Sequence, residues 1–145
     1  MSLIDEIRES WSWAGLDPVE ILGENDFGNL LIRDTSGRIW RLCPEDCYCR
    51  IVAMDFGQLA ALAKNVEFMK DWHMQPLVEE ARARCGPLRE GWKYNLRLPG
   101  LLGGQYGGDN LGITTQVELI RASARVAKSV EREPLVPPPA NPSSR

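Results

Sequence analysis

Residues 27–54, FGNLLIRDTSGRIWRLCPEDCYCRIVAM, contain three strand-like segments joined by two turns. In the first segment Leu30 and Ile32 fall on one side, as expected for a strand with one buried face. Residues 34–37 are typical of a tight turn, because Asp and Ser bond to nearby backbone and Gly adopts positive φ. Pro44 ends the second segment before the third begins. The predicted strands, which form an antiparallel meander, are 27–33, 38–42 and 48–54.

Helices are predicted on both sides of this meander. Ser2 can cap a first helix, and Asp55 can cap the first of the helical segments that follow the meander. Pro76 either kinks a later helix or restarts it, and Thr115 opens the last helix in a capping box. Residues 19–23 are either a strand or a helical turn, and further strands are predicted over 92–98 and 111–113. The pattern predicts an α+β domain, with helices packed on an antiparallel sheet of about five strands.

Residues 99–110, PGLLGGQYGGDN, form the glycine-rich loop, which holds five glycines in twelve positions. Glycine is favoured where the backbone needs positive φ or approaches another surface closely. The loop is therefore either a packed turn anchored by Leu101, Leu102 and Tyr106, or a backbone surface offered to a ligand. A phosphate site is the weaker of the two interpretations, because the loop has no Gly-Lys-Ser/Thr motif and a strand separates it from the next helix.

Composition and charge exclude several classes of protein. The net charge is −3 and no cluster of Lys and Arg is present, so a direct nucleic-acid interface is not expected. No apolar run is long enough to span a membrane, and residues 1–9 do not resemble a secretory signal, so we expect a cytoplasmic protein. Half of the ten prolines follow residue 133. We therefore expect one domain over 1–133 and a disordered proline-rich tail over 134–145.

The residues most often used in catalysis and metal binding are sparse in this chain. His73 is the only histidine, and no motif supplies the partner that would orient it as a base. The cysteines lack the paired spacing of a zinc site, so buried reduced thiols are favoured over metal ligands. We expect no metal, no cofactor and no enzymatic activity, with a small hydrolase using His73 and a cysteine as an open alternative. The four cysteines are Cys43, Cys47, Cys49 and Cys85.

Several blocks of sequence carry a family resemblance. They are SWSWAGL at 10–16, NDFGN at 25–29, GRIWRLCPE at 37–45, FMKDW at 68–72, and LPGLLGGQY at 98–106 followed by Asn110. In this order the chain resembles the bacterial type VI secretion immunity family that is related to the immunity partners of Tde-type DNase toxins. The resemblance covers about residues 10–130 and departs at RASAR, 121–125, and in the tail. It implies a cytoplasmic antitoxin without catalytic residues that binds a cognate toxin.

The predicted partner surface is acidic and partly aromatic. Toxins that act on nucleic acids or nucleotides have basic clefts, and an acidic surface would be steered towards such a cleft and block it. The residues that we expect to contact the toxin lie near turns or in the glycine-rich loop. They are Glu24, Asp26, Glu45, Asp46, Tyr48, Tyr106 and Asp109. The alternative function is a nucleotide or phosphate sensor that uses the glycine-rich loop at 99–110.

Overall fold

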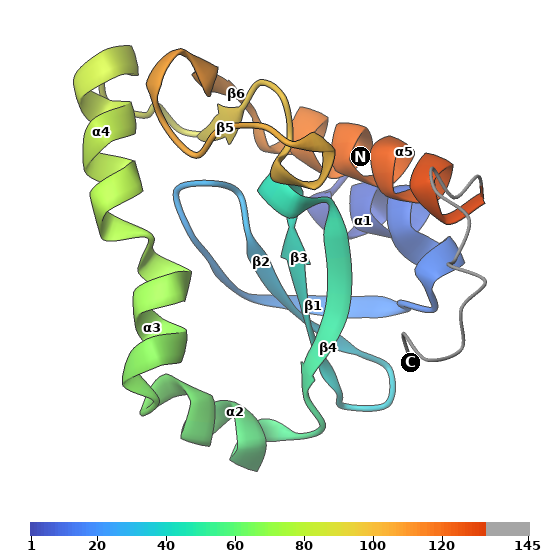
Figure 1. Cartoon of the computed structure of the whole chain (residues 1–145). Helices are drawn as coiled ribbons and strands as arrows, with labels where there is room; N and C mark the ends of the chain where they lie inside the picture. Colours follow the sequence, from blue (N-terminus) through green and yellow to red (C-terminus); the bar gives the residue numbers. More distant parts are fainter. Residues whose placement is uncertain (133–145) are drawn as a thin grey trace, which may run out of the picture.

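The computed structural model describes residues 1–132, in which helices pack against two antiparallel sheets (Figure 1). The predicted α+β class is confirmed. The tail expected over 134–145 lies outside the described residues. None of the helices within residues 1–132 combines the length and the apolar character needed to cross a lipid bilayer.

The larger sheet is the predicted meander, extended by one strand at its start. Its strands follow the order β1-β2-β3-β4, and each is antiparallel to the next. Residues 19–23 belong to a strand and not to a helical turn. The central strand β3 is buried on both faces. The bounds are β1 Pro18–Glu24, β2 Leu30–Asp34, β3 Ile39–Cys43 and β4 Tyr48–Ala53.

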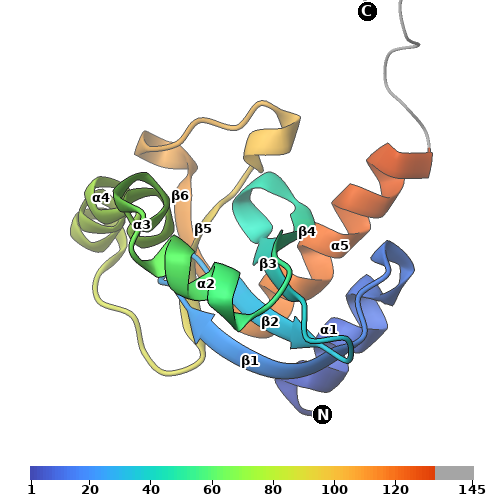
Figure 2. The same ribbon diagram turned by 90° about the horizontal axis from the view of Figure 1, so that it is seen from below.

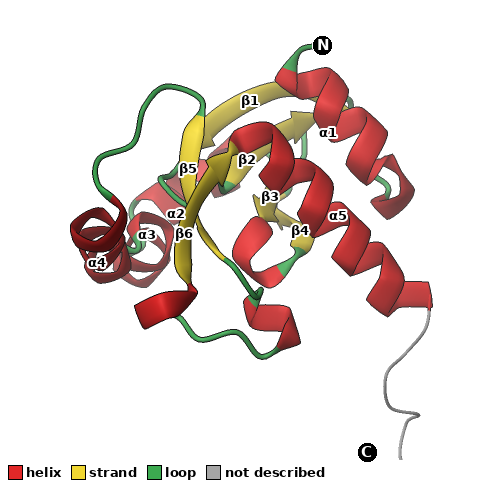
Figure 3. Ribbon diagram, turned by 90° about the horizontal axis from the view of Figure 1, so that it is seen from above, coloured by secondary structure: helices red, strands yellow, loops and turns green. Residues whose placement is uncertain are grey.

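Helices α1 (Leu3–Trp11) and α5 (Gln116–Arg132) cover one face of this sheet (Figure 3). The expected Ser2 cap of α1 is present and forms a full capping box, because the Ser2 hydroxyl accepts from the backbone of Asp5 and the Asp5 carboxylate accepts from the backbone of Ser2. Apolar residues of both helices meet those of the sheet in a continuous core. This core contains Ile7, Trp11, Leu16, Leu30, Ile32, Trp40, Leu42, Cys49, Ile120 and Ala124.

Three consecutive helices, α2 (Phe56–Ala63), α3 (Val66–His73) and α4 (Gln75–Cys85), form an arm along one side of the molecule (Figures 1 and 2). Asp55 caps α2, as predicted. The chain restarts a helix at Pro76 instead of kinking one, because Met74 leaves α3 with a φ of 49° and Pro76 fits the first turn of α4.

Strands β5 (Trp92–Leu96) and β6 (Leu111–Thr115) pair in a second sheet, so the strands are divided between two sheets and do not form one. Residues 25–29, between β1 and β2, contact the second sheet. The Asn25 side chain accepts hydrogen bonds from the backbone of Phe27 and Asn29, which forms a turn where the sequence indicated the start of β2. Tyr94 of β5 donates its N–H to the Asp26 carbonyl of this turn. Strand β5 is therefore hydrogen-bonded to the turn between β1 and β2.

Candidate functional site

The glycine-rich loop is held in one shape by hydrogen bonds to Asn110. The side-chain amide of Asn110 donates to the carbonyls of Leu98 (2.9 Å) and Gln105 (2.7 Å), and its oxygen accepts from the N–H of Leu98 (2.8 Å). A Cβ atom on Gly104 would lie 1.7 Å from the Leu98 carbonyl oxygen. The loop is therefore a packed turn in which position 104 requires glycine.

The side chains expected to anchor the packed turn are not buried. Leu101, Leu102 and Tyr106 are 45%, 41% and 45% exposed, so burial of these side chains does not hold the loop on the body of the domain. Asn110 and Glu80 do so instead, and Glu80 accepts a hydrogen bond of 2.8 Å from the N–H of Gly108. The N–H groups of Gly103 and Gly104 also donate within the loop. The Gly108 N–H, which could otherwise donate to a bound phosphate, is already bonded to the Glu80 carboxylate. This argues against the phosphate alternative.

Tyr106 and Asp46 meet at the base of the loop. Gly100 lies against both side chains, since a Cβ there would be 2.4 Å from Oδ1 of Asp46 and 2.7 Å from the hydroxyl of Tyr106. Partial burial raises the pKa of Tyr106, and its hydrogen bond to Asp46 acts in the same direction. The phenol therefore stays neutral at physiological pH, and 45% of the residue remains exposed. Tyr106 is thus a fixed aromatic group on the surface.

A buried polar network supports this region from below. Asn29 donates to Glu45 (2.7 Å) and accepts from Nε of Arg41 (2.9 Å). The Arg41 guanidinium also pairs with Asp71 of α3 and lies 5.3 Å from the ring centroid of Trp72. Burial raises the pKa of Glu45, while the hydrogen bond from Asn29 acts against that shift. The network joins the turn after β1, strand β3, the 3₁₀ turn after it and the arm.

Four of the predicted contact residues lie around the glycine-rich loop. Asp46 and Tyr48 line a hollow together with Leu101 of the loop. Burial raises the pKa of Tyr48 to about 12. Tyr106 lines a neighbouring hollow, and Asp109 is fully exposed with its carboxylate 3.2 Å from Arg84. These four side chains offer two phenols and two carboxylates from adjoining segments.

The other three predicted residues are placed differently. Glu45 is buried, so it supports the surface from within the network. Glu24 pairs with Lys93, and both Glu24 and Asp26 line a separate hollow beside Trp92. The seven predicted residues therefore do not form one continuous patch.

The hollow beside Tyr106 contains carboxylates that the sequence analysis did not select. We call it the Tyr106 hollow; it has a volume of about 430 Å³ and lies between the arm and the glycine-rich loop. Asp71 of α3 and Glu80 of α4 line it together with Lys70, over an apolar floor that includes Met74 and Leu77. Sequence periodicity places both carboxylates on helices, but it carries no signal that α3 and α4 turn them towards Tyr106.

The described residues show no arrangement typical of metal binding or cysteine catalysis. Within residues 1–132, no group of three or more His, Cys, Asp or Glu side chains could hold a metal ion, and no hydrogen bond joins His73 to a carboxylate. Burial raises the pKa of Cys47 to about 11 and that of Cys49 to about 12. These thiols are therefore protonated at physiological pH, unlike a nucleophilic cysteine.

Comparison with protein families gives a match that covers half of the chain. A profile described as "T6SS immunity protein Tdi1, C-terminal" matches residues 53–125, from the end of β4 into α5. The matched part contains the arm, both strands of the second sheet and the glycine-rich loop. A search of curated proteins gave no match.

Proposed function

We propose that this chain, which belongs to the family described as "T6SS immunity protein Tdi1, C-terminal", binds a cognate secreted toxin domain in the cytoplasm and neutralises it. The family match is the observation that carries this proposal. Inhibition by binding needs no chemistry from the chain, only a surface of about 800 Å² with good complementarity. The rigid glycine-rich loop and the network beneath it support such a surface.

The toxin-binding surface that we propose is centred on the glycine-rich loop. It contains Tyr106 and Asp109 together with Asp46 and Tyr48, and it continues into the Tyr106 hollow. Tyrosines are enriched among residues that dominate binding energy, and the exposed carboxylates would attract a basic partner. Glu24 and Asp26 form a second, smaller acidic area beside Trp92, which a large partner could also reach.

This acidic surface fits a toxin whose active site acts on nucleic acid or nucleotides. Such an active site needs positive charge to hold phosphates, and the same charge would favour the carboxylates near Tyr106. The chain would then inhibit by occluding the active site. Occlusion predicts that the substrate and the immunity protein compete for the toxin.

Co-expression with the product of the neighbouring gene tests the proposal. We expect a stable heterodimer and restored growth of cells that express the toxin. Tyr106→Ala and Asp109→Lys should each weaken the complex about ten-fold or more. Glu9→Lys, at an exposed position on α1, reverses a charge away from the loop and should leave binding unchanged.

Two results would contradict different parts of the proposal. If no heterodimer forms and growth is not restored, the chain is not the immunity protein of that toxin. If the heterodimer forms and both loop variants bind as tightly as the wild type, the surface lies elsewhere.

A further inference from the structure

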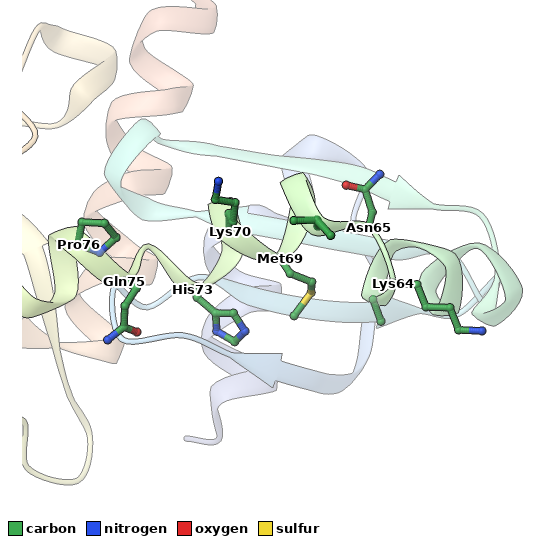
Figure 4. Close-up of a pocket in the computed structure, with 9 residues that line it drawn as sticks. Lys64, Asn65, Met69, Lys70, His73, Gln75 and Pro76 are labelled. Atoms are coloured by element: carbon green, nitrogen blue, oxygen red, sulfur yellow. The ribbon is translucent and has the colours of Figure 1, made fainter.

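The arm carries a groove that shares only Lys70 and Pro76 with the Tyr106 hollow. We call it the arm groove; it has a volume of about 540 Å³ and runs from the end of α2, along α3, to the start of α4 (Figure 4). Met69 and His73 extend from the same side of α3 in this view. The lining residues are Ala63, Lys64, Asn65, Val66, Met69, Lys70, His73, Gln75 and Pro76.

Helix α3 has two apolar faces, and only one of them is used by the fold. Phe68 and Trp72 lie over the Arg41 guanidinium, with their ring centroids 6.0 and 5.3 Å from it. Val66 and Met69, one turn apart on the other face, line the arm groove. Val66 is 70% exposed. Within the described residues this face is therefore only partly covered, since Met69 is half-buried and Val66 is exposed.

Helix α2 shows the same excess of exposed apolar surface. Its sequence, FGQLAALA, has no charged residue, yet none of its side chains is buried. Phe56 at its start is 56% exposed. A helix with this composition normally packs against another element, and exposed apolar surface on a soluble domain marks interaction sites.

The charge around the arm groove indicates what would bind there. Lys64 and Lys70 lie along it, and none of its lining residues is acidic, although the whole chain has a net charge of −3. The Tyr106 hollow, by contrast, has two carboxylates, Asp71 and Glu80, beside Lys70. Charge complementarity therefore favours a partner segment that is apolar on one side and acidic at its edges.

We propose that the arm groove binds an amphipathic helix of a second protein, with acidic residues flanking its apolar stripe. A helix that lies in a groove uses anchors at i, i+3, i+4 and i+7, and the groove follows the axis of α3. Met69 suits such a site, because its unbranched side chain adapts to different apolar anchors. Lys64 and Lys70 would pair with the flanking carboxylates. Lys64 and Val66 line only the arm groove, so changes at these two positions separate this interaction from toxin binding.

A designed probe tests this proposal without the natural partner. The probe is a stapled helical peptide of about 16 residues with leucines at the anchor positions and glutamates beside them. A second peptide has lysines in place of the glutamates. Fluorescence anisotropy with the full chain should show saturable binding of the glutamate peptide, about ten-fold or more weaker binding of the lysine peptide, and weaker binding of the glutamate peptide at high salt.

Variants of the protein locate the binding. Val66→Glu and Lys64→Glu lie at exposed positions and should each weaken binding of the glutamate peptide about ten-fold. Lys128→Glu, an exposed reversal on α5, is the matched control and should change nothing. The proposal is overturned if the glutamate peptide does not bind or if the lysine peptide binds equally well. It is also overturned if sedimentation shows that the chain alone is a dimer that Val66→Glu dissociates, because the groove would then hold a second copy.

Discussion

Replacing Asp34 by Asn should destabilise the fold although the two side chains have nearly the same shape. Asp34 is 1% exposed and accepts four hydrogen bonds at the β2–β3 turn. Oδ1 accepts from the N–H groups of Ser36 and Arg38, each at 2.9 Å. Oδ2 accepts from Nε of Arg38 and from Nε1 of Trp40, also at 2.9 Å. An asparagine can keep the first pair, but its NH₂ group then faces the two donors of the second pair.

The cost follows from those two donors. The Trp40 indole N–H would be left unpaired in the core, at about 1–3 kcal/mol. The Arg38 side chain is partly exposed, so its ion pair adds about 1 kcal/mol or less. We therefore expect Asp34→Asn to lower the free energy of unfolding by about 2–4 kcal/mol. Urea denaturation followed by circular dichroism measures this change without relying on tryptophan fluorescence.

A double-mutant cycle with Trp40→Phe isolates the indole contribution. Because phenylalanine has no N–H to leave unpaired, Asp34→Asn should cost about 1–2 kcal/mol less in the Trp40→Phe background. The reasoning is refuted if Asp34→Asn costs under about 0.5 kcal/mol, or if its cost is the same in both backgrounds.

The contribution of the Asp34 carboxylate to the free energy of unfolding should depend on pH. Burial acts to raise the pKa of Asp34, but the hydrogen bonds from Trp40 and Arg38 outweigh it and lower the pKa below 3.8. A carboxyl with a lowered folded pKa stabilises the protein above its unfolded pKa, and this contribution is lost as the pH falls through the folded pKa. The difference in stability between the wild type and Asp34→Asn should therefore shrink below about pH 4.

Three further outcomes are expected. Gly104→Ala should lower the free energy of unfolding by about 1–3 kcal/mol, because its Cβ would clash with the Leu98 carbonyl. Gly103 has open space around it and a φ of 90°, so Gly103→Ala should cost only the left-handed backbone strain, about 1–2 kcal/mol. Denaturation measures both changes. Glu45→Gln keeps an acceptor for Asn29 and removes a buried charge, which becomes unfavourable as the pH rises through the raised pKa of Glu45. Thermal unfolding at neutral pH should therefore show unchanged or increased stability for Glu45→Gln. Glu45→Ala leaves Asn29 without this acceptor and should be less stable by about 1–3 kcal/mol. Of the four thiols, Ellman's reagent should label only Cys85 in the folded protein, because the other three are buried and their pKa values are raised. Labelling of all four thiols before unfolding would contradict the structure.

Local signals predicted most of the elements, because these signals act over a few residues. The Ser2 cap, the Asp34 turn and the interruption of the helix near Pro76 each depend on neighbours within four positions. Asn25 joins distant elements, because its side chain forms the turn after β1 and also donates to the Trp72 carbonyl of the arm. That contact joins residues 47 positions apart, and no period or turn motif encodes it.

The candidate surface was predictable only in part for the same reason. Tyr106 and Asp109 stand in a loop whose glycines mark it in the sequence. Asp71 and Glu80 come to the same hollow because Met74 turns the chain between α3 and α4. Glu45 is buried beside Asn29, which also accepts from Arg41, itself buried on strand β3. Polar networks between distant elements therefore set which of the predicted residues face solvent.

The rigidity of the glycine-rich loop bears on how tightly it could hold a toxin. Binding is weakened by the entropy lost when side chains and loops become ordered, and a loop fixed beforehand avoids much of that loss. Asn110 fixes the loop through three hydrogen bonds. Asn110→Ala should then weaken the toxin complex even if its side chain never touches the toxin. The loss should appear as slower association, because fewer free molecules hold the binding shape, whereas Asp109→Lys should act through charge and depend on salt.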